Sequence, residues 1–512
     1  MLYNTNQISK ISKHYNYCVV GSGIGGTVLA DVLKNSNVAV IEAGNFKHNK
    51  QSADRYISTG RPFRLTTTTS ISVGGTSNLW HGVLSNLDNI DFQKRSWIPN
   101  SGWPISLETL RPFYKRSLQF FGLNKPEYLY NEYLNDVLEL ELKRIKHDPE
   151  IIKNKLFLQN KQLISLKNHL KKIGSNKKLS LDLYYNFDVK EVNLKGEKVK
   201  SIIGFNTAGK KISLSADVFI LCCGALETPR ILFNSKSLYQ NNDFNNHDIL
   251  GRFLMDHPMG NLYQVKFPTP LSAPIYSDFE YKKNQKIKSG FVFSNDFQES
   301  HRLANHNFFL RPSFIEGINN ESESIKLAML TFKDGNIDLK KIFSLIRNPN
   351  AVFQILVYKF SLRVLYRYAD VFFVTEQIPH RKSFVKLSGS QSDSYGYSKL
   401  EVNWKLTKYD IENVKKCFEL NKHALRLNNF KSTHQMNDIN WETTLTSAAH
   451  HVGTARMGTS MKNGVVDRNL KVFGTSNLFI SDGSVFTTSG NVNSGLTIAA
   501  LSLRLGEHLI SL

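Results

Sequence analysis

The sequence predicts an α/β protein: a doubly wound parallel sheet, joined to a second domain of α+β structure. One unit predicts the parallel sheet. Residues 15–20 form a short apolar strand that runs into a glycine-rich turn and a helical stretch, Thr27–Leu33, and a second apolar strand follows at 38–41. This strand–turn–helix–strand order is typical of doubly wound parallel sheets. Over 260–430 the texture changes to a mixture of β-like runs and helices, which predicts the second domain.

The turn at 21–26 reads Gly-Ser-Gly-Ile-Gly-Gly and places Gly21, Gly23 and Gly26 in the G-x-G-x-x-G spacing of dinucleotide sites. The first glycine permits the tight turn, the second lets the backbone approach a pyrophosphate, and the third lets helix and strand pack closely. The helix N-terminus then presents free N–H groups to the phosphates. Glu42 ends the second strand, where an acceptor for a ribose 2′-OH belongs, and this favours FAD or NAD over NADP.

The remaining elements follow from composition and periodicity. Residues 60–95 are rich in Gly, Ser and Thr and predict a long loop that lines a ligand. Lys and Leu at helical spacing predict helix over most of 105–176, and further helices are expected from about Glu227 and over 406–427. The expected strands are 181–189, 199–206, 216–223, 371–376 and 384–387. Gly-rich turns and short strands return from about residue 435.

Lys and Arg exceed Asp and Glu by 22 formal charges over the 512 residues. Such an excess suggests nucleic-acid binding. However, no long block of like charges occurs and the aromatic residues are scattered, so no nucleic-acid partner is predicted. The charge does favour anionic partners, such as a phosphorylated substrate or an acidic membrane surface.

Cysteine usage and the absence of targeting signals predict a cytoplasmic protein. Cys18 and Cys222–Cys223 lie in apolar runs and no C-x-x-C pair occurs, so reduced core thiols are expected. The first 15 residues contain no apolar stretch of a secretory signal, and no apolar run long enough for a transmembrane helix occurs. The His and Cys residues lack metal-ligand spacing, so no metal is expected.

Residues 340–367 raise the alternative of a location at the membrane periphery. Apolar residues recur at helical spacing after Pro349, interleaved with Lys359, Arg363 and Arg367. A basic amphipathic helix can lie in an anionic membrane surface, or it can pack on a domain with its charges in solvent. Peripheral membrane contact through 342–367 is therefore one of two open interpretations.

Further motifs follow the first unit in a characteristic order. They are VGGTSNLW at 73–80, GALETPRIL at 224–232, GRFLMDHP at 251–258, HHVGTARMG at 450–458, GVVD at 464–467, NLFISDGS at 477–484 and TSGNVNSGLT at 488–497. In their order and spacing, these motifs resemble those of the glucose–methanol–choline (GMC) oxidoreductase family. The resemblance extends from residue 17 to about residue 507.

The resemblance implies a Rossmann-like FAD-binding domain and an α+β substrate-binding domain with an antiparallel sheet. The first is expected to be discontinuous, built from 1–100, 180–260 and 435–512, and the second to comprise 101–179 and 261–434. The family also implies oxidation of a CH–OH group in a sugar, polyol, glycoside or other alcohol. Dehydrogenase and oxidase remain alternatives, with oxygen, a quinone or a carrier protein as the electron acceptor.

Carried over residue by residue, the resemblance places the FAD pyrophosphate and adenosine ribose on the glycine turn and Glu42. Gly74, Gly75 and the loop to Asn78 would lie along the flavin, and Val189 would reach the adenine through its backbone. Asp482 and Gly483 would face the pyrophosphate–ribityl part. The expected cofactor-binding residues are Gly21, Ser22, Gly23, Ile24, Gly25, Gly26, Glu42, Gly74, Gly75, Asn78, Val189, Asp482 and Gly483.

Two departures from the family pattern bear on the flavin. Trp80 stands where Asn or His is frequent, and Ser494-Gly495 stands where Pro-Thr is usual. Some relatives attach the flavin to a His near this loop, but the aligned residues here are Asn78 and Leu79, which cannot form that bond. Non-covalent FAD is therefore expected, with His81 as the alternative tether.

The resemblance also identifies a catalytic pair. Alcohol oxidation needs a base for the hydroxyl proton, and His has an unperturbed pKa suited to this task. The family's base corresponds to His450, and its His-or-Asn partner to Asn493, whose amide orients the substrate oxygen. His451 is expected to point elsewhere if the segment is extended, and His257 to be structural.

The same sequence features leave two other functions open. A flavin-dependent lyase or decarboxylase would use the same fold, and a basic nucleic-acid-binding protein is the remote alternative. The intact His450–Asn493 pair favours oxidation. The substrate pocket is expected within 260–430, where Glu376-Gln377-Ile378-Pro379 is interpreted as scaffold.

Overall fold

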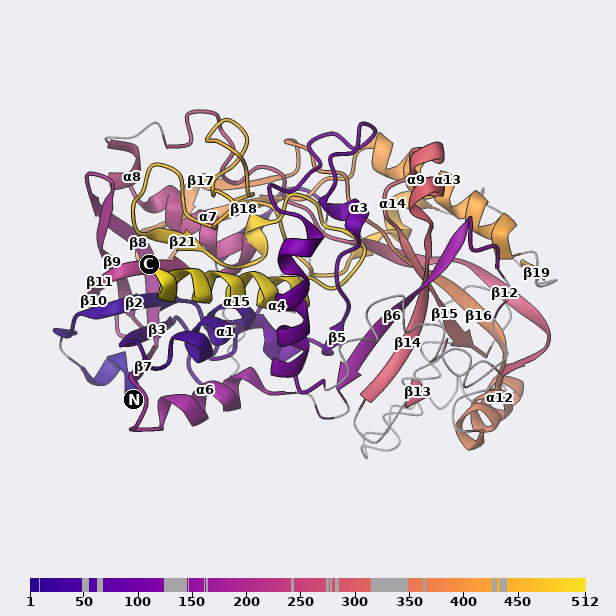
Figure 1. The fold of residues 1–512 in the computed structure, drawn as a ribbon, viewed down its shortest axis with the longest axis horizontal. Helices are drawn as coiled ribbons and strands as arrows, with labels where there is room; N and C mark the ends of the chain where they lie inside the picture. Colours follow the sequence, from indigo (N-terminus) through magenta and orange to yellow (C-terminus); the bar gives the residue numbers. More distant parts are fainter. Residues whose placement is uncertain are drawn as a thin grey trace.

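The structure is a computed structural model. It describes all residues except 9, 48–54, 62–67, 124–144, 146, 161, 163, 241–243, 273–275, 277–278, 281–284, 315–348, 362–364, 426–430 and 433–439. Two large sheets lie side by side (Figure 1): a parallel sheet near both chain termini and a larger antiparallel sheet. This arrangement confirms the predicted fold class. The domain boundaries stay a prediction.

The parallel sheet has six strands in the order β1-β7-β3-β2-β11-β21. The strands are β1 (Leu2–Asn4), β2 (Tyr15–Val20), β3 (Val38–Glu42), β7 (Leu181–Tyr185), β11 (Ala216–Leu221) and β21 (Leu478–Ile480). The central strands β2, β3 and β11 are short apolar runs because helices or a second sheet cover both faces. Chain segments from the beginning, middle and end of the sequence therefore share one sheet.

Helices and a small sheet cover this core. On one side α1 (Ile24–Leu33) contacts β2 and β3, and α15 (Gly495–Ser511) packs between α1 and α4 (Leu107–Phe120). The antiparallel sheet of β8 (Phe187–Lys195), β9 (Lys198–Asn206) and β10 (Lys211–Leu214) contacts β3 and β11. Further helices are α6 (Leu166–Gly174), α7 (Gly224–Asn234) and α8 (Ser237–Gln240).

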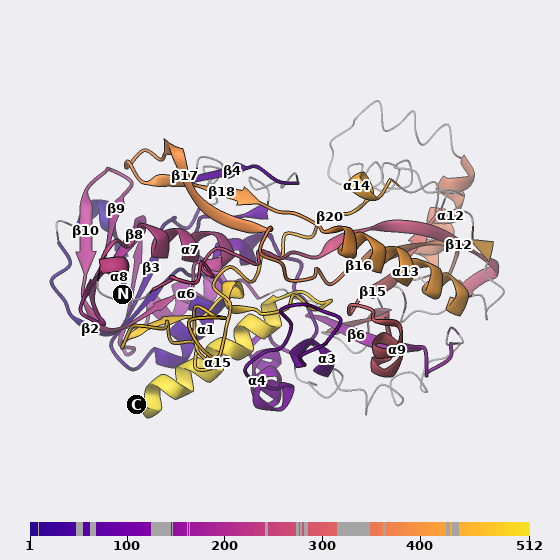
Figure 2. The same cartoon turned by 90° about the horizontal axis from the view of Figure 1, so that it is seen from above.

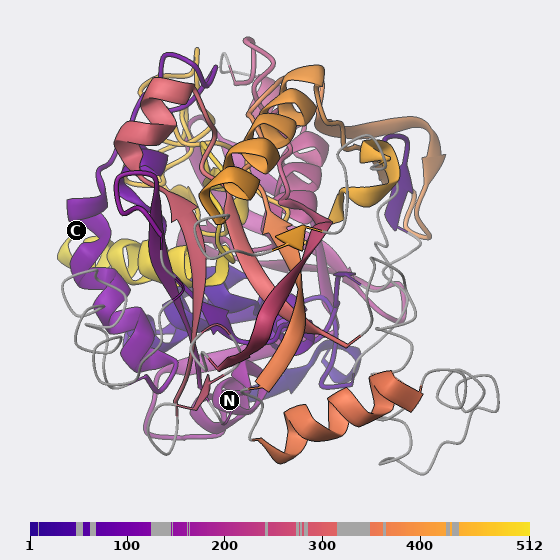
Figure 3. The same ribbon diagram turned by 90° about the vertical axis from the view of Figure 1, so that its right-hand side faces the viewer.

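The second large sheet has nine strands and is antiparallel throughout the described pairs. Its main path is β19 (Lys431–Ser432), β12 (Pro258–Ser272), β16 (Leu365–Val374), β15 (Asn307–Ser313), β14 (Gln285–Phe293), β6 (Ile152–Asn160) and β5 (Val83–Leu84). Off this path β13 (Phe279–Glu280) pairs with β14, and β20 (Thr446–Ser447) pairs with β12. Figure 3 shows α13 (Lys408–Leu425) and α12 (Pro349–Phe360) beside this sheet.

A separate three-stranded mixed sheet accompanies the two large sheets. It consists of β17 (Phe384–Ser392), β18 (Ser398–Asn403) and β4 (Tyr56–Ser58), and it packs against α7. Figure 2 shows it on the opposite side of the molecule from α15 and α4. Short elements complete the chain: η1 (Thr5–Gln7), η3 (Gly75–Leu79), α3 (Asn89–Phe92), α9 (Asn295–His301), α14 (Trp441–Thr444) and η9 (Gly483–Val485).

Three sequence predictions about single elements were wrong. Helix was expected over most of 105–176, but 152–160 is strand β6, held between β14 and β5. The single strand expected at 181–189 is divided at Asn186, whose φ of 62° turns the chain out of the parallel sheet into β8. The first helix begins at Ile24 instead of Thr27, so Gly23 stands at its N-cap.

The basic amphipathic segment is shorter than predicted. Helix α12 ends at Phe360, and Leu365 and Arg367 belong to strand β16; residues 342–348 and 362–364 lie outside the described residues. Ala351 and Ile355 pack on Phe314, while Phe353 and Phe360 are 64% and 84% exposed. The helix therefore has one packed face and one exposed apolar face. Across the described residues, no helix is long and apolar enough to cross a membrane.

Candidate active site

The glycine turn after β2 forms one end of a large cavity. Gly21 has a φ of 98°, and a β-carbon there would lie 2.5 Å from the carbonyl oxygen of Cys222. A β-carbon on Gly26 would lie 1.9 Å from the carbonyl oxygen of Gly21. Both positions therefore require glycine for packing between β2, α1 and the end of β11.

Gly23 differs from its neighbours because a β-carbon there would meet nothing within 4 Å. It is the N-cap of α1, and no side chain caps this helix end. The first N–H groups of the helix are thus presented to open space, and helix N-termini of this kind bind phosphate groups. The geometry fits a pyrophosphate that approaches the backbone at Gly23.

Glu42 lies at the end of β3 and is buried beside this turn. Its Oε2 accepts hydrogen bonds from the backbone N–H of Ser22, at 3.1 Å, and from the Ser22 hydroxyl. Its Oε1 accepts from the N–H of Gly44 at 2.9 Å. Burial raises the pKa of Glu42, and the hydrogen bonds from Ser22 and Gly44 act in the opposite direction. Since a carboxylate oxygen accepts more than one hydrogen bond, Glu42 retains capacity for a ribose hydroxyl.

The cavity has a volume of about 740 Å³ and continues from the glycine turn to the end of the antiparallel sheet. It brings together predicted residues from distant parts of the chain. Those that line it are Gly21, Ser22, Gly23, Ile24, Gly25, Glu42, Gly75, Val189, His450, Asp482, Gly483 and Asn493. Gly26, Gly74 and Asn78 are not among its described lining residues.

Gly74 and Asn78 shape the loop that lines the cavity. The N–H of Gly74 donates to the Ser22 hydroxyl at 3.0 Å. The Asn78 amide nitrogen donates to the Ser72 hydroxyl and to the carbonyls of Val73 and Gly75, each at 3.0 Å. The side chain of Asn78 therefore braces the loop around Gly75, and the Gly74 N–H holds this loop against the glycine turn.

Trp80 and Gly495, the two departures from the family pattern, lie against each other. A β-carbon at Gly495 would come within 3.0 Å of the Trp80 ring, and both residues line the cavity. A threonine at 495 would therefore collide with the indole. The larger residue in the loop is compensated by the smaller one at the start of α15.

Asp482 connects the end of β21 to helix α7. Its Oδ2 accepts from the N–H of Gly224 at 2.9 Å and from the Thr228 hydroxyl at 2.6 Å, and its Oδ1 accepts from the N–H of Ser484. Burial raises the pKa of Asp482, which these hydrogen bonds oppose. Asp482 lines the cavity and also fixes the relative positions of two elements around it.

The predicted catalytic pair is in direct contact in the wall of the same cavity. The amide nitrogen of Asn493 lies 2.9 Å from Nε2 of His450. With the amide donating, Nε2 accepts and the neutral ring carries its proton on Nδ1. Burial, followed by the neighbouring His257, lowers the pKa of His450. His450 is therefore held in the neutral form that a proton acceptor needs.

Asp256 holds the backbone around His450. Its Oδ1 accepts from the N–H of His450 at 2.9 Å and from the N–H of His257 at 2.6 Å. Ala449 has a φ of 63°, an uncommon conformation for a residue with a β-carbon. The acidic side chain thus stabilises a strained turn that aims His450 at Asn493.

His451 and His257 have other surroundings. Nε2 of His451 lies 3.9 Å from Oδ2 of Asp256, whereas Nε2 of His450 contacts the Asn493 amide. The His257 ring is fully buried and stands edge-on to His450, with centroids 5.2 Å apart. Both histidine residues therefore support the segment, although His451 also lines the cavity.

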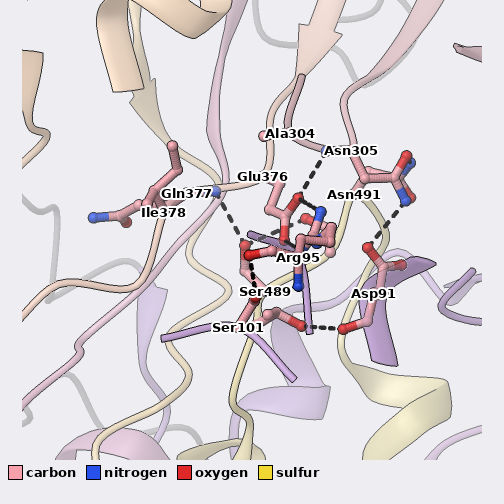
Figure 4. A network of polar contacts seen from close by, with 12 residues as sticks. Asp91, Arg95, Ser101, Ala304, Asn305, Glu376, Gln377, Ile378, Ser489 and Asn491 are labelled. Carbon is pink, nitrogen blue, oxygen red and sulfur yellow. Dashed lines mark hydrogen bonds and ion pairs between the residues drawn. The ribbon is translucent and has the colours of Figure 1, made fainter. Parts of the chain in front are cut away.

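A buried polar network ties the Asn493 segment to the antiparallel sheet (Figure 4). Arg95 binds both carboxylate oxygens of Glu376, and the Glu376 carboxylate also accepts from the N–H of Asn305 at 2.7 Å. Asn305 donates to Asp91 at 3.0 Å and accepts from the Asn491 amide at 2.9 Å. Burial and the nearby Glu376 raise the pKa of Asp91 to about 7.

Several lining residues were missed by sequence reasoning. One group lies near the glycine turn, where Arg55 pairs with Asp188 at 2.8 Å and with Glu227 at 3.1 Å. A second group lies on the antiparallel sheet and comprises Phe157, Met259, Lys288, Asn307, Phe309, Arg311, Phe372 and Val374. Side chains alternate between the two faces of a strand, and this alternation could have identified the second group as facing the cavity. It could do so only if the pairing of the strands were known.

Comparisons with known proteins agree with this arrangement. The family described as GMC oxidoreductase matches residues 379–502. The chain is 25% identical over 303 residues to the fructose dehydrogenase large subunit of Gluconobacter japonicus, covering 58% of this chain and 47% of that protein. It is 23% identical over 353 residues to 2-methyl-1,2-propanediol dehydrogenase of Mycolicibacterium austroafricanum, covering 65% and 54%. The chain thus spans about half the length of these curated relatives.

Solved structures match over nearly the whole chain. Pyridoxine 4-oxidase from Mesorbium loti has a TM-score of 0.59 at 17% identity, covering 97% of this chain and 99% of that one. A formate oxidase variant from Aspergillus oryzae RIB40, studied for FAD modification, has a TM-score of 0.57 at 15% identity, with 98% and 99% covered. At these identities the likeness shows the fold.

Proposed function

Since the chain belongs to the GMC oxidoreductase family, we propose that it binds FAD non-covalently and oxidises the CH–OH group of an alcohol or sugar. The observation that carries this proposal is the 2.9 Å contact between His450 and Asn493 in the wall of a cavity that also contains the glycine turn. One cavity then accommodates both a dinucleotide and an alcohol beside a proton acceptor.

The residues present fit FAD at both ends of the cofactor. The open N-terminus of α1 at Gly23 suits the pyrophosphate, and Glu42 suits the adenosine ribose. Helix α15 begins at Gly495 without a side-chain cap, and Ser494 and Gly495 line the same cavity. Its N-terminus would stabilise negative charge on the flavin pyrimidine ring. When bound, FAD supplies the acceptor for the hydride removed from the carbinol carbon.

The chain's own residues handle the hydroxyl proton and the substrate position. The hydroxyl of a bound alcohol would take the place of the Asn493 amide at Nε2 of His450. Because burial keeps the ring uncharged before reaction, Nε2 can then accept the hydroxyl proton. The Asn493 amide would then donate its hydrogen bond to the substrate oxygen and orient it. Asp256 keeps His450 in place through the backbone.

His81 lines the cavity and is the alternative covalent tether. The aligned positions do not offer one, because the Asn78 amide is engaged in the loop and Leu79 has no nucleophile. Acid denaturation of the yellow protein is expected to release all flavin into the supernatant. Flavin that stays with the precipitate of the wild type, but is released from His81→Ala, would overturn the non-covalent assignment.

The relatives found are dehydrogenases and oxidases, which supports oxidation over lyase or decarboxylase chemistry. The test is the visible spectrum of the purified protein before and after anaerobic addition of sugars, polyols and simple alcohols. Oxidised flavin bands that bleach with an alcohol are expected. Bleaching should be lost in His450→Ala and retained in His451→Ala, the matched control. A colourless protein that takes up no added FAD would overturn the proposal.

A further inference from the structure

Side chains position the loop that carries Asn493. This loop, residues 487–493, follows η9 and leads into α15, and residues 487–492 are all buried. In the described part of the chain, no backbone–backbone hydrogen bond holds 487–492. Because the loop lacks the backbone pairing of a helix or strand, contacts of its side chains determine where Asn493 lies.

The middle of the loop rests on α3 and on the residue two positions before that helix. The Thr488 hydroxyl donates to the backbone carbonyl of Asp91 at 2.9 Å. Gly490 has a φ of 63°, and a β-carbon there would lie 2.3 Å from Leu87 and 3.2 Å from Oδ2 of Asp91. The loop and α3 are therefore in direct contact, and Gly490 permits that close approach.

An amide–amide hydrogen bond anchors the loop two residues before Asn493. The Asn491 amide nitrogen donates to Oδ1 of Asn305 at 2.9 Å, and both residues are fully buried. Asn491 and Asn493 line the cavity, whereas Val492 between them is buried and is not among the described lining residues. A displacement of Asn491 is thus passed to Asn493 through a single residue.

Two acids fix the direction in which the Asn305 amide faces. Its nitrogen donates to Oδ2 of Asp88 at 2.9 Å and to Oδ1 of Asp91 at 3.0 Å. Its oxygen accepts from the Gln298 amide at 3.2 Å as well as from Asn491 (Figure 4). A flipped amide would place its oxygen against two carboxyl groups and its nitrogen against two N–H donors. Only the observed orientation makes all four hydrogen bonds.

The backbone of Asn305 is fixed as well. Its N–H donates to the Glu376 carboxylate at 2.7 Å, and Arg95 binds both oxygens of that carboxylate. The side chains of Arg95 and Glu376 are fully buried, and a bidentate pair of this kind is geometrically specific. Asn305 is therefore a rigid support for the Asn491 amide.

This chain of contacts ends at the catalytic pair. The Asn493 amide nitrogen lies 2.9 Å from Nε2 of His450, and during the proposed reaction the same amide has to meet the substrate oxygen. Its position must then be set by its own loop, since the substrate hydroxyl occupies Nε2. Misplacing an orienting group by about 1 Å can slow a reaction by about a hundredfold.

We propose that Asn305 and Asn491 are positioning residues for alcohol oxidation: the bond between their amides sets where the Asn493 amide meets the substrate oxygen. This proposal rests on the proposed alcohol oxidation and adds two residues that act through Asn493. Asp88 and Asp91 support them by holding the Asn305 amide in one orientation. None of these residues accepts the substrate proton.

The first experiment is a double-mutant cycle on the rate constant of flavin reduction by an alcohol in the FAD-saturated holoenzyme. Asn491→Ala alone should lower this rate constant roughly tenfold or more. In an Asn493→Ala background, the same substitution should change it by less than about twofold, because the group through which Asn491 acts is already absent. No effect of Asn491→Ala alone, or a full further loss in the double variant, would overturn the proposal.

The second experiment separates the lost hydrogen bond from a lost volume and from general damage. Asn491→Leu keeps the approximate volume but cannot donate, and should slow flavin reduction as much as Asn491→Ala. Asn413→Ala is the matched control, because the buried Asn413 on α13 accepts from the N–H of Ala304 and donates to the carbonyl of Arg302. It should lower the stability of the fold and change flavin reduction by less than about twofold. Equal slowing in Asn413→Ala would contradict the proposal.

The third experiment is independent of turnover and observes the contact between His450 and Asn493 by nitrogen NMR of isotope-labelled histidine rings. The Nε2 resonance of His450 is identified by its loss in His450→Ala. Asn491→Ala should move this resonance in the same direction as Asn493→Ala does, because Nε2 loses its hydrogen-bond donor, and Asn413→Ala should leave it in place. An unmoved resonance in Asn491→Ala would overturn the positioning role. A wild type that oxidises no alcohol but shows this shift would overturn the proposed function alone.

Discussion

Gly23→Ala should separate cofactor binding from folding. The φ of Gly23 is −65°, which alanine adopts readily, and the added β-carbon meets nothing within 4 Å in the protein. Replacing glycine by alanine at a compatible position stabilises by about 0.4–1 kcal/mol through the unfolded chain. The loss of glycine at an N-cap acts in the opposite direction by a similar amount. The stability of the FAD-free protein should therefore change by less than about 1 kcal/mol.

FAD affinity should fall sharply in the same variant. The methyl group of Gly23→Ala would occupy the space through which the pyrophosphate approaches the α1 N-terminus. Displacing a phosphate from even one charge-assisted hydrogen bond costs about 1.5–3 kcal/mol, or roughly ten- to hundredfold in dissociation constant. The assay is quenching of flavin fluorescence during titration of the FAD-free protein, together with denaturant unfolding of the same sample.

Gly26→Ala is the matched control at the other end of the motif. Its β-carbon would lie 1.9 Å from the carbonyl oxygen of Gly21, so backbone must move and the fold should be destabilised by several kcal/mol, or fail to form. Wild-type FAD affinity in Gly23→Ala would refute the placement of the pyrophosphate. A loss of stability in Gly23→Ala as large as in Gly26→Ala would refute the reasoning from open space.

Two further predictions concern other parts of the molecule. The pKa of Asp91 is raised to about 7, above its unfolded value, so the folded state favours the protonated acid and the free energy of unfolding should fall as pH rises from about 4 to 7. Asp91→Asn should flatten this dependence in denaturant unfolding at several pH values, and an unchanged slope would exclude Asp91 as its source. Membrane contact through α12 predicts co-sedimentation with anionic liposomes that is lost in the double variant Phe353→Ser/Phe360→Ser, two residues that are 64% and 84% exposed. Absent or unchanged co-sedimentation would reject that contact.

Local backbone requirements made the nucleotide end of the site predictable from sequence. The strand, the glycine turn and Glu42 lie within one short stretch of sequence. Each position needs a particular residue type for its function in a dinucleotide site. The structure adds that Gly21 and Gly26 pack against other backbone while Gly23 faces open space. The motif alone assigns a role to each glycine. The structure distinguishes the two glycines that pack against backbone from Gly23, which a ligand can approach.

The antiparallel sheet could not be predicted in the same way. Lys and Leu at helical spacing predicted helix around 152–160, but this stretch becomes strand β6 because β14 and β5 supply hydrogen-bond partners from distant sequence. The orientation of Lys288 and Arg311 toward one cavity depends on the β14–β15 register. A shift of either strand by one residue would turn that strand's side chain to the other face.

The sequence by itself determined the fold class, the glycine turn and the candidate pair His450 and Asn493, because short motifs encode local geometry and family likeness. Only the tertiary structure decided that this pair is in contact, that Asp256 holds it, and that side chains of the antiparallel sheet line the same cavity. These features depend on contacts between residues that are far apart in the sequence, 43 positions for His450 and Asn493 and 194 positions for Asp256 and His450. No single segment determines such contacts.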